Sequence, residues 1–364
     1  MKFRNQIARF ALMITAVAFM FSCTEDDKKE VARLDSAGSY FAANAGKYSI
    51  LTDALRKTGL LATLTGAGSY TIFAPSNAAF TAAGLSSASI NALNPLVPAD
   101  LIEIANLRVV LQNHVLTPGT RAADLLAGGY FKTFAFFRPN APLAPTPATA
   151  LLTSGSQMSI FFNQVGPNVL INGGATNRGA TVTNADIDLA NGILHEIDAV
   201  LFLPTIVNHI AANPNLSTLL TVATSTGGAF GDQTAVRNIL TGATNLSART
   251  LICPNNKAFE NATTGTGFLT GAAVTPANVT RVLQYHLLPP GNRLASFFNT
   301  EGFASFTSIP APSQNFLVFR LGSLGFRIQD NGTAPNNISK FLINDIQGVN
   351  GVLHIVDKVL QPTF

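Results

Sequence analysis

The chain has 364 residues, of which 47% are hydrophobic and 12% are charged. This length predicts two or three domains, and the apolar content suffices for more than one hydrophobic core. Three of the 23 Lys and Arg lie within the first nine residues, which leaves 20 basic against 19 acidic residues in the rest of the chain. This near-neutral balance, without a basic cluster in the sequence, argues against a nucleic-acid partner.

Residues 1–22 are typical of an export signal peptide. A basic start is followed by an apolar run over 10–21, which is too short to cross a bilayer as a helix. The Ser22-Cys23 pair that follows resembles the lipobox of bacterial lipoproteins, in which the Cys becomes the lipidated N-terminus. Met20 and Phe21 depart from the residues usual at those positions. An ordinary secretory peptide with a chance Cys is the alternative.

Residues 23–46 are expected to form a lipidated tether. Glu25-Asp26-Asp27 resembles the acidic surface-export signal of Bacteroidetes-type lipoproteins, although a charge run after an anchor is also typical of a solvated tether. We therefore expect an exported outer-membrane lipoprotein exposed at the cell surface. With Cys23 acylated, Cys253 would be the remaining thiol, and its apolar neighbours favour a small buried residue over a reactive one.

Three motifs occur twice in the same order, which predicts two tandem domains: domain 1 over 47–204 and domain 2 over 205–364. In the last pair, seven of eleven positions are identical. The pairs are TIFAPSNAAF (71–80) and TLICPNNKAF (250–259), VLQNHVLTPG (110–119) and VLQYHLLPPG (282–291), and NGILHEIDAVL (191–201) and NGVLHIVDKVL (350–360).

Each copy begins with a helical pattern. Ser49 is positioned to cap a helix over 50–64, and the counterpart over 206–221 is interrupted at Asn213-Pro214. A strand ended by Pro follows in each copy, and Ser76 or Asn255 is positioned to cap a short helix after it. Further helices are predicted over 100–111 and after Thr275-Pro276, and the two strands over 70–74 and 250–253.

The later part of each copy is rich in short strands, so each domain is predicted to have an α+β fold. Asn191-Gly192 and Asn350-Gly351 predict tight hairpins, because a type I′ turn needs positive φ at both central residues. The strand after each hairpin should pair with the strand before it. The predicted strands are 169–172, 180–183, 316–320, 326–329 and 341–344.

Together the three motifs resemble those of the fasciclin (FAS1) family. The middle motif matches the family's Tyr-His pair at Tyr285-His286, whereas Asn113-His114 departs from it. The resemblance covers nearly all of the chain after the tether. It implies two domains, each a wedge of β-strands flanked by several helices, and it implies adhesion or matrix binding, because family members are mostly secreted or membrane-anchored modules of that kind.

Four of the five histidines fall at paired positions of the repeat: His114, His195, His286 and His354. A zinc site needs three or four converging ligands, and each domain offers two His without a Cys/His cluster at ligand spacing. We therefore expect buried histidines that hydrogen-bond within the domain. Metal binding is the alternative.

Asp198 and Asp357 fall on the strand face opposite His195 and His354. A structural hydrogen bond or a solvated position is expected for both, because no second carboxylate is placed to form an acid–base pair. The chain also lacks a Gly-x-Ser-x-Gly elbow, a Walker loop and a second His after His195-Glu196. We therefore expect that the protein is not an enzyme and that it binds no cofactor and no metal.

An Asp-Ile pair precedes each Asn-Gly turn: Asp186-Ile187 and Asp345-Ile346. In animal FAS1 proteins an Asp-Ile pair at this place belongs to proposed integrin-binding motifs, so these four residues are candidates for binding. The alternative is an Asp that hydrogen-bonds the backbone of its own turn.

The expected function is a lipid-anchored, non-catalytic adhesion protein that binds a protein or a glycan on a cell surface or matrix. A carrier or accessory binding protein for a polysaccharide or a small apolar ligand is the alternative. An apolar pocket would favour the carrier, whereas a flat polar surface with an exposed Asp-Ile loop would favour adhesion.

Overall fold

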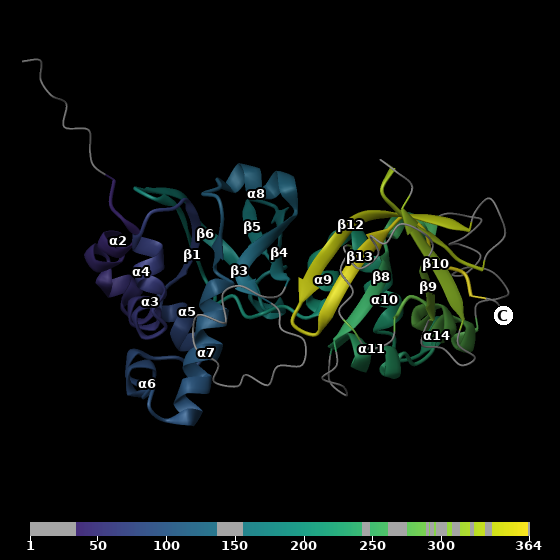
Figure 1. Ribbon diagram of the computed structural model, residues 1–364, viewed down its shortest axis with the longest axis horizontal. Helices are drawn as coiled ribbons and strands as arrows, with labels where there is room; N and C mark the ends of the chain where they lie inside the picture. Colours follow the sequence, from purple (N-terminus) through teal and green to yellow (C-terminus); the bar gives the residue numbers. More distant parts are fainter. Residues whose placement is uncertain are drawn as a thin grey trace, which may run out of the picture. The chain divides into compact units, whose positions relative to one another are not determined.

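The computed structural model describes residues 34–136, 156–241, 248–260, 275–288, 291, 295, 304–307, 314–320, 324–331 and 337–362 (Figure 1). One compact unit extends over Ser36–Phe364. Within the described residues, no helix is both long and apolar enough to cross a bilayer. The signal peptide, Cys23 and the acidic run at 25–27 lie outside this part of the chain and stay predictions.

The packed chain begins earlier than predicted. Helix α2, Ala37–Ala43, starts after Ser36, whose side chain accepts a hydrogen bond from the backbone of Ser39. Phe41 in this helix is fully buried, and its ring centroid lies 5.5 Å from that of Tyr48. The tether predicted over 23–46 is therefore too long, because burying a Phe side chain contributes about 2 kcal/mol and holds this segment on the domain.

The helix predicted over 50–64 is in fact two helices. Helix α3 runs over Ala45–Lys57 and α4 over Leu60–Thr65, and Gly59 between them has a φ of 74°. Only glycine adopts this conformation without strain, so the chain turns there. Ser49 lies inside α3 instead of capping it, and its hydroxyl accepts a hydrogen bond of 3.0 Å from Asn77 Nδ2.

The remaining elements of domain 1 follow the predicted order. Ser76 caps its helix as predicted, because its side chain accepts a hydrogen bond from the backbone of Ala79. The elements are β1 (Tyr70–Pro75), α5 (Asn77–Ala82), α6 (Ser87–Ala92), α7 (Pro98–Gln112), β2 (Val115–Leu116), α8 (Ala122–Gly128), β3 (Tyr130–Phe136), β4 (Gln157–Val165), β5 (Asn168–Ile171), η2 (Ala175–Asn177), β6 (Ala180–Leu189) and β7 (Gly192–Ile197).

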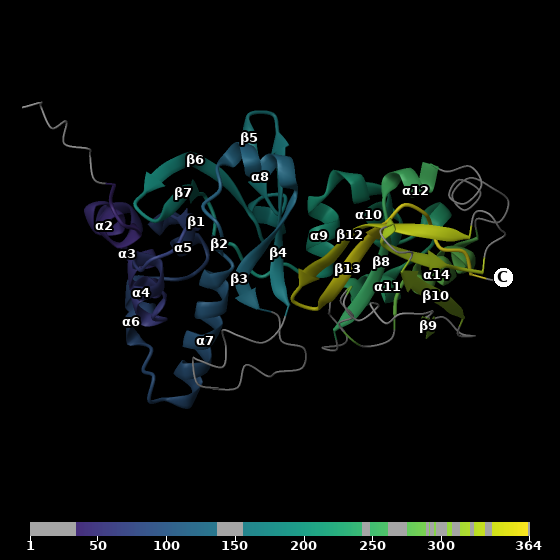
Figure 2. The same cartoon turned by 45° about the horizontal axis from the view of Figure 1, so that its top comes forward.

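The seven strands of domain 1 close into a barrel in the order β1-β2-β3-β4-β5-β6-β7. The last strand, β7, pairs in parallel with β1 and antiparallel with β6. Helices α2, α3 and α4 lie together on one side of these strands in both views (Figures 1 and 2). One apolar core fills the space between helices and strands, and a second, which includes Phe73, Phe162 and Leu201, lies among the strands.

Domain 2 repeats this plan with a six-stranded sheet among the described residues, in the order β8-β13-β12-β11-β10-β9. Asn255 and Thr275 cap their helices as predicted. The elements are α9 (Ile206–Ala212), η3 (Pro214–Leu216), α10 (Ser217–Ala223), η4 (Gly228–Phe230), α11 (Thr234–Thr241), β8 (Arg249–Pro254), α12 (Asn256–Glu260), α14 (Pro276–Tyr285), β9 (Ala304–Thr307), β10 (Asn315–Arg320), β11 (Phe326–Gln329), β12 (Ile338–Gly348) and β13 (Gly351–Val356).

Both predicted hairpins are present, but their glycines have a different role. Gly192 pairs with Leu189, so it begins the strand after the turn instead of lying in the turn. A Cβ at Gly192 would lie 1.9 Å from the carbonyl oxygen of Tyr70 on the parallel strand β1. A Cβ at Gly351 would likewise lie 2.0 Å from the carbonyl oxygen of Arg249. The Asn-Gly pairs therefore allow close approach of two strands, and the type I′ assignment was wrong.

Candidate functional site

The two Asp-Ile pairs lie in matching bulges of β6 and β12. The pairing register with the closing strand shifts between Asn184 and Ile187 in domain 1, and between Ile343 and Ile346 in domain 2. The bulged aspartates adopt left-handed backbone conformations, with a φ of 61° at Asp186 and 60° at Asp345. Asp is one of the few residues that tolerates this conformation, which explains its presence in both copies.

Each bulge is held by the histidine of the closing strand. The backbone N–H of Asp186 donates to Nδ1 of His195 at 3.2 Å, and that of Asp345 donates to Nδ1 of His354 at 3.2 Å. Nε2 of His195 donates to the carbonyl oxygen of Thr120 at 3.0 Å. This pair of bonds defines a neutral ring, and burial lowers the pKa of His195.

The aspartate carboxylates cap backbone groups of the same domain. Oδ1 of Asp186 accepts from the N–H of Ala122, at the first residue of α8, at 2.9 Å, and Oδ1 of Asp345 accepts from Ala295 at 2.6 Å. Their side chains are nevertheless 36% and 31% exposed. Ile346 is buried in the core of domain 2, and Ile187 is half-buried. Only the aspartate of each pair presents a polar group to solvent, and a binding role for the pairs stays a prediction.

His114 and His286 link the end of a helix to the segment after the closing strand. Nδ1 of His114 donates to Val110 O at 2.8 Å, and its Nε2 accepts from the N–H of Leu201 at 2.9 Å. His286 makes the same two bonds, at 2.8 and 2.9 Å, with Val282 and Leu360. Burial lowers the pKa of each ring to about 4, so both are neutral at pH 7.

Asp198 and Asp357 bind the backbone of the neighbouring strand. Oδ1 of Asp198 accepts from the N–H of Thr181 at 2.7 Å, and Oδ1 of Asp357 accepts from that of Lys340 at 2.6 Å. Among the described residues, no three His, Cys, Asp or Glu side chains are grouped to hold a metal ion. Cys253 is fully buried, which raises its thiol pKa and keeps it unreactive.

A charged cluster around Glu196 of β7 was not predicted from the sequence. Glu196 Oε1 accepts a hydrogen bond of 2.5 Å from the Tyr48 hydroxyl, and Lys47 Nζ lies 2.6 Å from Oε2. Burial raises the pKa of Glu196, but these partners lower it by more, so the carboxylate stays ionised. Domain 2 has Ile355 at the position of Glu196. A Glu in one copy and an Ile in the other, within an otherwise matching motif, was the sequence feature that could have indicated this cluster.

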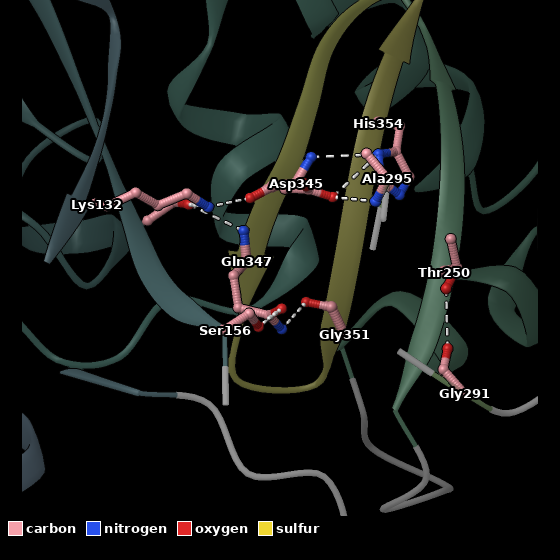
Figure 3. Close-up of polar contacts among 10 residues, drawn as sticks. Lys132, Ser156, Thr250, Gly291, Ala295, Asp345, Gln347, Gly351 and His354 are labelled. Atoms are coloured by element: carbon pink, nitrogen blue, oxygen red, sulfur yellow. Dashed lines mark hydrogen bonds and ion pairs between the residues drawn. The ribbon is translucent and has the colours of Figure 1, made fainter. Parts of the chain in front are cut away.

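A further polar cluster lies between the domains (Figure 3). The Lys132 ammonium on β3 donates to the carbonyl oxygen of Asp345 and to Ser159 Oγ, the latter at 3.1 Å. The N–H of Gln347 donates to the same Ser159 Oγ at 3.0 Å, and Gln347 Oε1 accepts from Ser156 Oγ. The Asp345 bulge therefore contacts domain 1.

The Asp186 bulge of domain 1 carries a different set of neighbours. Arg121 and Asp188 form an ion pair of 2.7 Å beside it, and both side chains are 50% exposed. Asp188 occupies the position that Gln347 has in domain 2. Asp186, Asp188 and Arg121 thus form a polar surface, which we call the domain 1 bulge surface.

Comparison with known proteins identifies the repeated unit. A model of the Fasciclin domain matches residues 46–204 and 222–362. Protein sll1483 of Synechocystis sp. is 29% identical over 199 residues, which cover 54% of this chain and 91% of that protein. A solved FAS1 domain pair from the insect cell adhesion molecule Fasciclin I is 17% identical, with a TM-score of 0.48, over 85% of this chain and 97% of that one. The predicted α+β fold is confirmed, and the chain belongs to the fasciclin domain family, with two FAS1 domains in tandem.

Proposed function

We propose that this protein is a non-catalytic adhesion or binding protein that engages a protein or glycan partner through the domain 1 bulge surface. Fasciclin domains are typically adhesion or binding modules, and two of them make up most of this chain. The single observation that carries the proposal is the exposure of Asp188 and Arg121 beside the bulge. A partner can bind these two side chains in place of their ion pair with each other. Breaking that pair costs little free energy, because a surface ion pair contributes only about 0–1 kcal/mol.

The buried polar groups support a binding function over catalysis. The ring nitrogens of His114 and His286 are both committed to backbone partners, and Nδ1 of His195 is held by the bulge. A general base needs a free nitrogen or oxygen within reach of its substrate. These histidines therefore support the fold, and the polar groups available to a partner lie on the surface.

The test uses the soluble fragment 24–364 as bait on a glycan array and against cell-surface extracts. Asp188→Asn and Arg121→Gln each remove one exposed charge and should weaken capture at least threefold, without a change in melting temperature. Asp124→Asn, which also removes an exposed carboxylate, is the matched control. Equal capture by all variants would place binding elsewhere, whereas retention of apolar ligands alone would favour a carrier.

The membrane anchor is proposed from the N-terminal sequence alone. Cys23 follows an apolar run and a small residue, and an acidic run follows it. Acylation there would attach the protein to the outer membrane and, with export, expose it at the cell surface. Cys23→Ser should abolish labelling by a fatty-acid analogue, and intact cells should expose the wild-type protein to added protease. Persistent labelling would refute the anchor, and complete protection would refute surface display.

A further inference from the structure

We propose that the two copies of the bulge have separate roles: the copy at Asp345 joins the two domains, and the copy at Asp186 remains available to a partner. We call the contact between the two domains around Lys132, Gln347 and Tyr130 the joint. The evidence for it is independent of the proposed binding function. The availability of the Asp186 copy rests on that function. The two parts are tested by different measurements.

Gln347 is the centre of the joint. It is fully buried, and its Nε2 donates to the carbonyl oxygens of Gly348 and Gly351, both at 2.8 Å. Its Oε1 accepts from Ser156 of domain 1. These contacts need a side chain that donates at one end and accepts at the other, and an ionised carboxylate cannot donate. The Asp that domain 1 carries at this position would leave two carbonyls unsatisfied and bury a charge.

Lys132 supplies the charge of the joint. Its ammonium reaches across to the carbonyl oxygen of Asp345, as Figure 3 shows. It also donates to Ser159 in its own domain. Lys132 is exposed, so its ammonium keeps contact with water while two protein oxygens hold it across the joint. A carbonyl oxygen is its acceptor, so the contact does not require the Asp345 side chain, which caps Ala295 instead.

Apolar and aromatic contacts surround these polar groups. Tyr130 of domain 1 packs against the core of domain 2, and its hydroxyl donates to His209 O at 3.4 Å and accepts from Asn213 at 3.3 Å. His209 Nε2 in turn lies 3.1 Å from Gln347 O. Ala135 and Met158 of domain 1 form a small buried cluster with Ala248 of domain 2. Gln347 and this apolar cluster are therefore shielded from water, which strengthens the hydrogen bonds of Gln347.

The contact cannot be repeated between molecules through the same residues. The pairing registers of the two sheets can be aligned strand by strand, starting from His195 and His354. In this alignment Lys132 corresponds to Thr307 of domain 2, and Ser159 corresponds to Asn315. Domain 2 thus has no lysine at the position of Lys132, so it cannot make the same contact with the bulge of another copy.

Hydrogen exchange of the fragment 24–364 tests the joint with a reciprocal pair of variants. Gln347→Asp should open the joint and raise the exchange rate of peptide 345–351 at least tenfold. Asp188→Gln, the reverse change at the matching site, should leave peptide 186–192 unchanged. Lys132→Met should reproduce the effect of Gln347→Asp, and Lys340→Met, at an exposed lysine, is its control.

Two outcomes would overturn the joint. One is unchanged exchange of peptide 345–351 in Gln347→Asp and Lys132→Met, and the other is an equal rise in peptide 186–192. If these variants fail to fold, Ser159→Ala removes one hydroxyl from the joint and should give a smaller rise confined to 345–351. Binding by the domain 1 bulge surface is measured separately by capture, so either part can fail alone.

Discussion

The hydroxyl of Tyr48 donates a hydrogen bond of 2.5 Å to Glu196, which ties α3 near the start of domain 1 to the closing strand β7. The corresponding positions in domain 2 are apolar. Asn77 and Asn256 make matching bonds to α3 and α10, which aligns Tyr48 with Leu216, and the repeated motif aligns Glu196 with Ile355. A charged cluster thus occupies these positions in domain 1, whereas in domain 2 they hold two aliphatic side chains that belong to one apolar core.

This equivalence predicts strong coupling between two substitutions. Tyr48→Leu alone removes the hydroxyl that donates to Glu196 Oε1, although Lys47 still bonds Oε2, and Glu196→Ile alone removes the carboxylate that accepts from Tyr48. Each change should cost about 2 kcal/mol. The double variant reproduces the domain 2 pair and should cost at least about 1 kcal/mol less than the sum. Urea unfolding of the fragment 24–364 measures these free energies. Glu103→Gln, at an exposed glutamate, is the control, and additive costs would contradict the prediction.

Stability should fall as the pH is lowered from about 6.5 towards 4. His114, His209 and His286 have folded-state pKa values of about 4, below the 6.5 of the unfolded chain, because burial disfavours the charged ring. The unfolded state therefore binds more protons in this window, and stability is lost as the pH falls. Each ring contributes up to about 2 kcal/mol of this loss at pH 5.

Urea unfolding at pH 7, 6 and 5 measures this loss of stability. His286→Gln removes one of these titrating rings and should reduce the slope of unfolding free energy against pH. A flat profile in the wild type would show that the folded and unfolded chains take up protons equally, which would contradict the lowered pKa values.

Gly192→Ala and Gly351→Ala should be among the most destabilising single substitutions. The added Cβ would lie within 2.0 Å of a carbonyl oxygen on the neighbouring parallel strand in each case, so the closing strand must separate from β1 or β8. We expect a loss above about 3 kcal/mol in thermal or urea unfolding. Gly46→Ala is the control, because a Cβ there meets nothing within 4 Å and Ala favours the helix. A loss below about 1 kcal/mol at Gly192 would contradict the close approach.

Asp186→Asn and Asp186→Ala should differ in stability. Asn tolerates the left-handed backbone and keeps an oxygen that can accept from Ala122, so its cost should stay below about 1 kcal/mol. Ala has no acceptor and is strained at a φ of 61°, so its cost should reach about 2 kcal/mol. Melting temperatures measure the difference, and equal losses would show that the carboxylate does not support the bulge.

Local patterns predicted three helix caps correctly, although they failed for the cap at Ser49 and for the type I′ turns. The caps at Ser76, Asn255 and Thr275 were predicted from a residue and the helix that follows it, and all three are present. The repeated motifs predicted that each closing strand pairs with the strand before it, as β6–β7 and β12–β13 show. The boundary of the tether failed, because burial of Phe41 depends on Tyr48 and the rest of the core.

The sequence by itself determined the family, the two copies and the α+β fold, because these follow from ordered motifs and local periodicity. Only the tertiary structure decided what the shared residues do. Gly192 is required by the approach of β1, which is far away in sequence. The two Asp-Ile pairs are identical in sequence. In the structure Lys132 contacts the pair in domain 2, whereas an exposed Arg121–Asp188 ion pair lies beside the pair in domain 1. A motif specifies its own backbone, whereas its exposure depends on which distant side chains fold against it.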